Sequence, residues 1–363
     1  MPLQSSQTGT AKIIVAMSGG VDSSVAAALL KKQGFDVTGV FMKFWLGLST
    51  GLVERWNRCC SSDAEKRARA VAKILKMPFY VFNFSKEFKK KIVDDFLKEY
   101  QVGRTPNPCV VCNKEIKFGL LLKKALALEA DFVATGHYVR IKGDRLLKGK
   151  DKDKDQSYFL WQLSQKQLKH ILFPVGNYTK PEVRILAKKF KLPFFETPES
   201  QEICFVQNTT NEFLARYLKQ KPGSIVDLKG KVLGKHRGLA FYTLGQRKGI
   251  GLSGGPYFVL KKDLEKNLLI VTKNEKDLEQ KELRFKNANW LSPKDPAKAW
   301  PTGQAGKIKA KIRYRAKLAS GKLVKPNKFV FDKPQCAITP GQSVVFYLGE
   351  ELLGGGIISN AVF

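Results

Sequence analysis

The chain lacks the features that would place it in a membrane or an export pathway. No uninterrupted apolar stretch reaches the roughly 18 residues that a membrane-spanning helix needs, although 43% of the 363 residues are hydrophobic. Residues 1–10 have neither the positively charged start nor the apolar centre of a signal peptide. We therefore expect a cytoplasmic protein whose apolar residues form the cores of several domains.

Cysteines and acidic residues are also scarce. Six cysteines are too few for a secreted scaffold held together by disulfides. Each cysteine is therefore expected to be a buried core residue, a reactive thiol or a metal ligand. The 32 acidic residues face 64 lysines and arginines, which gives a net charge of +32. Such an excess repels itself unless a polyanion binds, so nucleic acid is the expected partner. The alternative is that the excess positive charge only keeps the protein soluble or reflects a generally basic proteome.

The order of sequence patterns predicts an α/β fold with a parallel, helix-covered sheet, followed by two β-rich modules. Apolar runs alternate with helical patterns over 10–210, notably at 36–43, 64–76, 79–84, 86–100, 118–128 and 132–135. Glycine-punctuated strands predict a small central domain over 211–280, and alternating strands predict a β-barrel over 281–363. The charged segment 148–155 is expected to be a mobile loop.

A glycine loop follows the first apolar run and leads into a helical pattern; it reads Ser18, Gly19, Gly20, Val21, Asp22, Ser23 and Ser24. Backbone N–H groups and the positive end of a helix dipole meet at such a loop, so ATP is the expected ligand. The loop lacks the Walker A lysine, which argues against kinase or motor chemistry, and its acidic Asp22 suits phosphates bridged by Mg²⁺. The alternative is a plain turn whose serines cap an ordinary helix.

Three more residues follow apolar runs that we interpret as parallel strands. Met42 comes at the end of one run, and Gly136 and His137 come after another. Ligands bind beyond the carboxyl ends of such strands, so these residues are expected to line the same crevice as the glycine loop. The Met42 side chain could pack against an adenine ring or in the core, and its position in the sequence fits both equally.

Cations alternate with apolar residues between 307 and 318; they are Lys307, Lys309, Lys311, Arg313, Arg315 and Lys317. In a strand this period of two places all six on one face, over roughly 30 Å. A stripe of that length suits a nucleic-acid backbone, and a solvated barrel face is the alternative.

Three cysteines are candidates for chemistry. Cys109 and Cys112 lie three apart just before a helical pattern that begins at 116, and Cys204 lies at the end of the first domain. A helix N-terminus and nearby lysines favour the thiolate of Cys112. Zinc held with Cys59 and Cys60, and an iron–sulfur cluster on the three thiols with one open iron, are the alternatives.

Nine motifs together resemble the tRNA-specific 2-thiouridylases, a family of PP-loop ATP pyrophosphatases. They are Ala-Met-Ser-Gly-Gly-Val-Asp-Ser-Ser (16–24), Gly-Arg-Thr-Pro-Asn-Pro (103–108), Cys-Asn-Lys-Glu-Ile-Lys-Phe (112–118), Ala-Thr-Gly-His-Tyr (134–138), Lys-Asp-Gln-Ser-Tyr-Phe-Leu (154–160), Phe-Pro-Val-Gly (173–176), Ile-Cys-Phe (203–205), Tyr-Thr-Leu-Gly-Gln-Arg-Lys-Gly (242–249) and Thr-Pro-Gly-Gln-Ser (339–343). The resemblance covers nearly the whole chain.

The resemblance implies thiolation of the wobble uridine of tRNA at C2, with ATP and Mg²⁺, by a protein that is monomeric when no tRNA is bound. An upstream sulfur-relay protein would load a persulfide on Cys204, and Cys112 would be the nucleophile. The implied ATP-binding residues are Ala16, Met17, Ser18, Gly19, Gly20, Val21, Asp22, Ser23, Met42 and Gly136. The implied tRNA-binding residues are Asn107, Pro108, Cys109, His137, Lys154, Asp155, Gln156, Arg313, Tyr314 and Gln342.

Some members of that family carry aspartate where this chain has Cys109, so an acid role at this position is in doubt. Two other functions remain open. Another PP-loop enzyme, such as a small-molecule amidotransferase or another tRNA thiolase, would keep the glycine loop but lack this pair of thiols combined with the C-terminal barrel. An RNA-binding protein without activity would keep the cations but would have no use for the loop.

Overall fold

The computed structural model describes residues 11–45, 61–193, 203–292, 308–324 and 327–361. Its first domain is built on a five-stranded parallel sheet in the order β3-β2-β1-β4-β7. The strands are β1 Lys12–Ala16, β2 Asp36–Lys43, β3 Phe79–Asn83, β4 Phe132–Ala134 and β7 Ile171–Leu172. Because the chain order reverses on either side of β1, the switch point lies between the carboxyl ends of β1 and β4. The predicted parallel sheet is confirmed.

Helices cover this sheet, and their small apolar residues allow close packing. Helix α1 (Val21–Lys32) buries a run of alanine, valine and leucine side chains, and α2 (Ser62–Ile74) buries Ala64, Ala68, Val71 and Ala72 on one face. The other helices of the domain are α3 Ser85–Phe88, π-helical η1 Lys89–Val93, α4 Asp94–Gln101, α5 Pro108–Cys112, π-helical η2 Asn113–Leu121, α6 Leu122–Ala127, 3₁₀-helical η3 Ser157–Leu160, α7 Gln165–Leu168 and α8 Lys180–Lys189. None of the helices in the described ranges combines the length and apolarity needed to cross a bilayer.

One helix begins earlier than its sequence pattern indicates. The pattern begins at residue 116, whereas α5, η2 and α6 run on from Pro108. Asn107 caps the start by accepting from Val110 N at 3.4 Å, and proline occupies the first turn, where no N–H is required. Both cysteines of the Cys-x-x-Cys pair therefore lie on the helix rather than before it.

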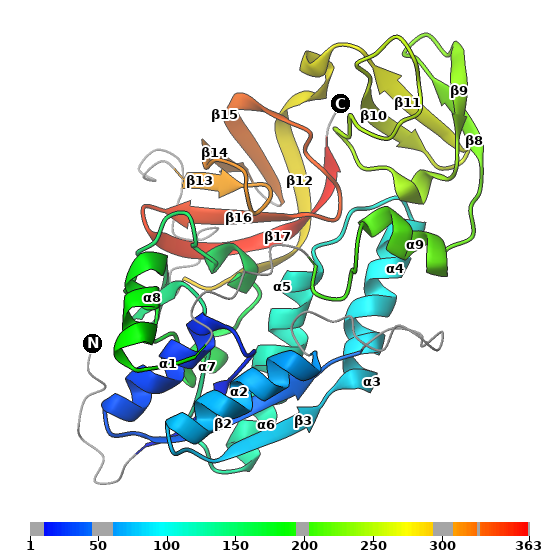
Figure 1. The fold of residues 1–363 in the computed structure, drawn as a ribbon. Coiled ribbons are helices and arrows are strands. Elements are labelled where there is room, and N and C mark those ends of the chain that lie inside the picture. The colour runs from blue at the N-terminus through cyan, green and yellow to red at the C-terminus, as the bar shows by residue number, and fades with distance from the viewer. Residues whose placement is uncertain (1–10, 46–60, 194–202, 293–307, 325–326, 362–363) are drawn as a thin grey trace.

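A central module follows, with a four-stranded sheet in the order β10-β11-β8-β9. Its elements are α9 Thr210–Tyr217, β8 Gly223–Val226, β9 Val232–His236, 3₁₀-helical η4 Leu239–Phe241, β10 Phe258–Asp263, β11 Leu268–Thr272 and 3₁₀-helical η5 Glu275–Leu278. Figure 1 shows this module beside α4 of the first domain and next to the barrel.

The last module is a β-barrel around Phe285, Phe329 and Phe346, closed by pairing of β12 with β17. Its strands are β12 Glu279–Trp290, β13 Ile308–Lys311, β14 Ala319–Val324, β15 Lys328–Cys336, β16 Ser343–Leu348 and β17 Glu351–Ala361. The barrel is confirmed, but its sheet also includes the hairpin of β5 (Val139–Lys142) and β6 (Arg145–Lys148). The first domain thus extends a hairpin into the barrel sheet.

The predicted cationic strand over 307–318 is wrong in extent. Strand β13 ends at Lys311, and a turn follows in which Ala316 N donates to Arg313 O. At about 3.3 Å per residue, four residues span only about 13 Å. Tyr314 leaves the strand direction because its ring packs on Phe159 of the first domain, with 4.4 Å between centroids. Lys307 lies outside the described residues.

The segment 148–155, expected to be a mobile loop, forms a hydrogen-bonded turn. Asp151 accepts from the backbone N–H groups of Asp153 and Lys154, which closes a tight turn. Asp155 is buried and accepts from Gly149 N at 3.1 Å. Side-chain hydrogen bonds to backbone explain why a run of alternating charges forms a defined turn here.

Candidate active site

The glycine loop lies at the switch point of the parallel sheet, between the end of β1 and the start of α1. Gly19 adopts φ +73°, and a Cβ there would collide with the backbone of Ala64. Gly20 is the N-cap of α1 and supplies no side-chain hydrogen bond to the helix start. The first-turn N–H groups therefore have no side-chain cap, which is the arrangement that binds phosphate.

The two serines of the loop stabilise its shape rather than cap the helix. Ser23 Oγ accepts from Ser18 N at 3.2 Å and donates to Gly20 O at 3.1 Å. Ser24 Oγ donates to the same carbonyl at 2.9 Å. The alternative in which these serines cap an ordinary helix is wrong, because both bond back to the carbonyl of the N-cap residue.

A lysine that sequence patterns did not reveal lies beside the loop. Lys180 begins α8, is 6% exposed, and its Nζ lies 2.7 Å from Asp22 Oδ1. Tyr138 Oη donates to the same carboxylate oxygen at 2.7 Å. The only sequence signal is that Lys180 closely follows the Phe-Pro-Val-Gly motif. A positive charge thus reaches the loop from a distant element instead of from a Walker A lysine.

Gly136 lies directly against the start of α1, since a Cβ there would come within 2.6 Å of Ser23 N. His137 is buried, and its Nδ1 lies 2.7 Å from Thr135 Oγ1. Burial, and secondarily the charge of Lys117, holds the pKa of His137 well below its usual value. His137 is therefore a neutral ring in this environment. Met42 is buried in the core cluster that also contains Ala16 and Val21, at the two ends of the glycine loop.

The thiols lie in one region of the first domain. Cys109 is half-buried and Cys112 is buried one turn later on the same helix. Phe205, the neighbour of the half-buried Cys204, packs edge-on against Phe88 and Phe96 at 5.8 and 5.3 Å. The η1 turn between those two phenylalanines packs against α5. Cys112 and Cys204 accordingly border the same apolar cluster.

The metal alternatives receive no support from this arrangement. In the described ranges, no three histidine, cysteine or acidic side chains converge as a metal site. The cluster considered for Cys109, Cys112 and Cys204 is thus not supported. Cys59 and Cys60 lie outside the described residues.

Residues expected to meet tRNA gather where the thiol helix, η3 and the barrel come together. The Asn107 side chain lies near the Tyr158 hydroxyl, which donates to Ser343 O at 2.9 Å. Tyr314 packs on Phe159, and Lys311 Nζ lies 5.4 Å from the Tyr314 ring centroid. Asn107 and Tyr314 are therefore linked through neighbouring residues of η3. Pro108 and the half-buried Cys109 belong to the first turn of the same helix.

Other residues of that set have structural partners. Gln156 Oε1 accepts from Tyr138 N at 3.0 Å, and Asp155 accepts from Ser157 Oγ at 3.0 Å. Arg313 is exposed, with its guanidinium 3.5 Å from Cys336 O. Lys154 is partly buried in the turn described above. Contact of any of them with tRNA stays a prediction.

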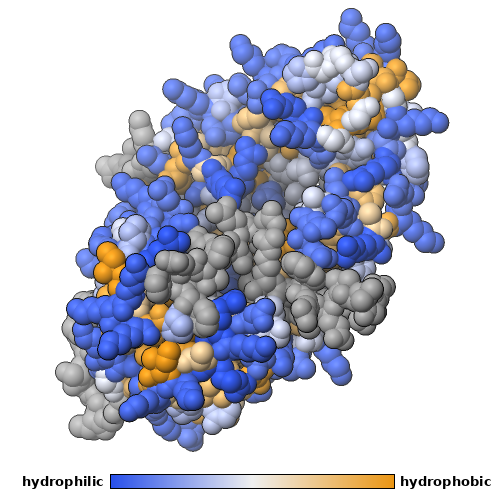
Figure 2. All heavy atoms as spheres, in the orientation of Figure 1, coloured by the Kyte–Doolittle hydropathy of each residue, from blue (hydrophilic) through white to orange (hydrophobic). Residues whose placement is uncertain are grey.

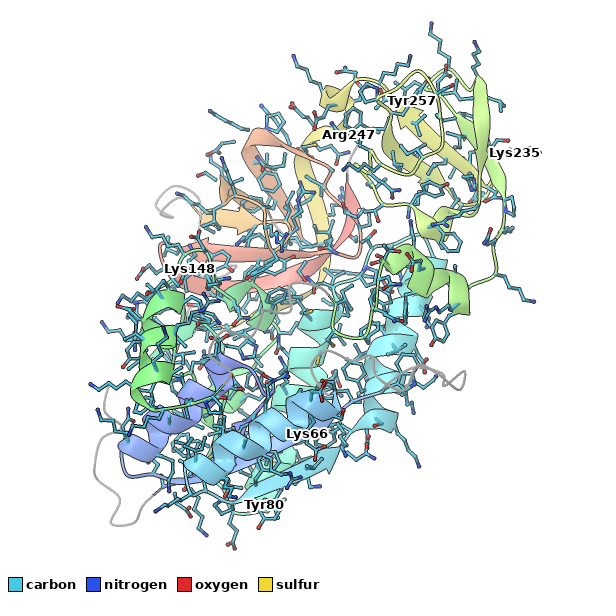
Figure 3. All side chains as sticks on the ribbon, in the orientation of Figure 1. Lys66, Tyr80, Lys148, Lys235, Arg247 and Tyr257 are labelled. Atoms are coloured by element: carbon cyan, nitrogen blue, oxygen red, sulfur yellow. The ribbon has the colours of Figure 1, made fainter. Side chains whose placement is uncertain are left out.

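Positive charge collects at the same junction. Burial lowers the pKa values of Lys148 and Lys311, and the charge of Lys311 lowers that of Lys148 further. Figure 3 shows Lys148 where β6 meets the barrel. The visible face as a whole is mostly hydrophilic, with small separate hydrophobic patches (Figure 2). The buried Asp155 partly offsets the shift at both lysines, and a bound polyanion would favour their charged forms in the same way.

Comparison with known proteins agrees with the three modules. Family models match in order: a tRNA methyl transferase HUP domain at 11–208, a tRNA methyl transferase PRC-barrel domain at 211–273 and an aminomethyltransferase beta-barrel domain at 280–358. The tRNA-specific 2-thiouridylase MnmA 2 of Thermoanaerobacter sp. (strain X514) is 48% identical over 96% of this chain and 98% of its own length. MnmA of Halothermothrix orenii is 47% identical over 96% of this chain and 99% of its own length. MnmA of Thermus thermophilus is 44% identical over 97% of this chain and 96% of its own length. The chain therefore belongs to the tRNA-specific 2-thiouridylases, a family of sulfurtransferase enzymes.

Proposed function

We propose that this protein replaces the C2 oxygen of a tRNA wobble uridine with sulfur, consuming ATP and releasing AMP and pyrophosphate. The observation that carries the proposal is the uncapped start of α1 in a domain that also holds two thiols bordering one cluster. A phosphate-binding loop supplies activation, and thiols supply the incoming atom. Neither part alone would thiolate RNA.

In the activation step, the C2 oxygen attacks the α-phosphorus of ATP, and pyrophosphate leaves. The N–H groups of the α1 start, with Ser18 exposed beside them, would stabilise the departing phosphates. Asp22 offers the carboxylate oxygen that Mg²⁺ prefers, and Mg²⁺ would supply charge neutralisation at the phosphates. Lys180 and Tyr138 would orient that carboxylate through their shared contact with Oδ1. Adenylation turns a poor oxygen leaving group into AMP.

In the sulfur step, the terminal sulfur of a Cys204 persulfide attacks C2 and expels AMP. The Cys112 thiolate then attacks Cys204 Sγ, which releases 2-thiouridine and leaves a disulfide between the two cysteines. A dithiol reductant restores both thiols before the next turnover. The position of Cys112 in the second turn of the helix begun by α5 favours its thiolate.

Two partners follow from this chemistry. The substrate is the tRNA anticodon arm, whose wobble base must leave its stack to reach a reacting group. Asn107, Pro108 and Cys109 would meet that base, while Lys309 and Arg313 hold the RNA backbone. A separate persulfide-carrying protein would load Cys204, and the chain would act as a monomer.

The direct test is mass spectrometry of tRNA nucleosides after incubation with ATP and a persulfide donor. We expect 2-thiouridine to appear only when ATP is present. Nucleosides unchanged under saturating ATP and donor would refute the proposal and favour an RNA-binding role.

Reversing two charges on the barrel tests the RNA contact. The double variant Arg313→Glu/Arg315→Glu should bind tRNA more weakly, and the slope of log affinity against log salt should fall by about 0.7 to 0.9 for each lost phosphate contact. Lys322→Glu, a charge reversal on the exposed face of β14, is the matched control. Unchanged affinity and slope in the double variant would show that this turn is only a solvated surface.

A further inference from the structure

All three modules meet at one short turn, residues 103–106, which directly precedes the thiol helix. From the central module, Lys262 Nζ donates to Gly103 O at 3.0 Å, and Thr243 Oγ1 lies 3.3 Å from Thr105 Oγ1. From the barrel, Pro340 O accepts from Thr105 N at 2.9 Å. We call residues 103–106 the junction turn.

Gln342 makes two side-chain hydrogen bonds with the junction turn. Its Nε2 donates to Thr105 O at 2.9 Å and to Pro106 O at 3.2 Å. Its own backbone is fixed to the barrel, because Ile358 N donates to Gln342 O at 2.8 Å. One amide therefore joins the barrel turn that precedes β16 to two consecutive carbonyls of the first domain.

The neighbouring glycine shows how closely the two segments approach. Gly341 has φ +94°, and a Cβ there would lie 2.9 Å from Thr105 N and Thr105 O. Only a residue without a side chain fits between the barrel loop and the junction turn. The contact is thus a fixed one and leaves little room for the turn to shift.

The junction turn transmits its position to the reacting groups. Pro106 and Pro108 restrict the backbone on both sides of Asn107, the N-cap of the helix that carries Cys109 and Cys112. If the junction turn moves, the start of the helix therefore moves with it, because the restricted backbone at Asn107 leaves no flexible joint between the two. A misplacement of about 1 Å at a reacting centre costs as much as about 100-fold in rate.

We propose that Gln342 is a positioning residue: it fastens the barrel to the junction turn and so holds the thiol helix in its reactive place. The proposal deepens the thiolation function proposed above and rests on it. It assigns the side-chain donor of Gln342 to the protein backbone rather than to RNA. The barrel then contributes to sulfur transfer as well as to any RNA contact.

The test compares variants that differ in their donors. Gln342→Glu and Gln342→Met both remove the amide donor, whereas Gln342→Lys keeps a donor of similar reach. Gln335→Glu is the matched control, because Gln335 Nε2 donates to Lys333 O and Pro334 O of its own strand, β15. Three quantities are measured: the tRNA dissociation constant, the single-turnover rate at saturating tRNA, and the alkylation rate of Cys112 without ATP or tRNA, followed by peptide mass spectrometry.

Both donor-free variants should slow the single-turnover rate by about tenfold or more and speed Cys112 alkylation, with tRNA affinity within about twofold of Gln335→Glu. Gln342→Lys should restore the rate and the alkylation to near the parent values. Weakened tRNA binding with normal saturated rate and normal alkylation would overturn the proposal and assign Gln342 to RNA. A parent protein that makes no 2-thiouridine would refute the proposed function alone, since the alkylation comparison needs neither substrate.

Discussion

Replacing either Cys112 or Cys204 with serine should abolish 2-thiouridine formation while tRNA affinity stays unchanged. Serine keeps the shape of cysteine but carries no sulfur and forms no anion near neutral pH, so neither persulfide transfer nor release can occur. Losing a covalent nucleophile lowers turnover by more than about 1,000-fold in well-studied enzymes. The measurement is nucleoside mass spectrometry beside a tRNA binding titration.

Cys336→Ser is the control for this pair. Cys336 lies in β15 of the barrel, and burial raises the pKa of its thiol, which disfavours the thiolate. Its replacement should leave thiolation near the parent level. Persistent 2-thiouridine formation by Cys112→Ser or Cys204→Ser would contradict the assigned sulfur step. A lowered melting temperature shared by both variants would instead point to damaged packing, so thermal unfolding is recorded in parallel.

Replacing Lys180 with methionine should slow AMP formation by about 100-fold, the usual cost of removing one preorganised group that stabilises developing charge. Methionine has a similar length but no charge. Of the two described partners of Asp22 Oδ1, only the Tyr138 hydroxyl would remain. The carboxylate would then be less well oriented beside the phosphates. Single-turnover AMP release at saturating ATP and tRNA measures the effect, and tRNA affinity should not change.

Lys150→Met separates this effect from general damage to α8. Lys150 precedes α8, and its Nζ lies 2.8 Å from Oε1 of Glu182, which is on α8; both side chains are exposed. Exposed ion pairs contribute little to stability, so AMP release should be close to that of the parent. Equal losses in the two variants would show that α8 packing, and not the charge beside the loop, sets the rate.

Local patterns were enough to predict the loop and the parallel sheet. The apolar run before Ser18, two glycines and the alanine-rich helix after them are neighbours in sequence, so their order alone indicates a strand, a turn and a helix. The Cys-x-x-Cys pair was recognisable for the same reason. The helix start was misplaced by eight residues because the cap formed by Asn107 and Pro108 was interpreted only as a turn.

Contacts between distant segments escaped prediction. Lys180 and Asp22 are 158 residues apart, and no period or motif joins them. The alternation through Tyr314 favours a strand, but packing of its ring on Phe159 stabilises a turn instead. The β5–β6 hairpin enters the barrel sheet because Leu147 pairs with Glu351 of β17. Each of these features depends on tertiary packing, which overrides local preference.

The central claim is that the glycine loop makes the C2 oxygen of uridine leave as part of AMP. The most direct test uses tRNA whose wobble uridine carries ¹⁸O at C2, with ATP and a persulfide donor, and determines the mass of the released AMP. We predict that AMP carries the label and that pyrophosphate does not. Unlabelled AMP formed together with 2-thiouridine would contradict adenylation of the base.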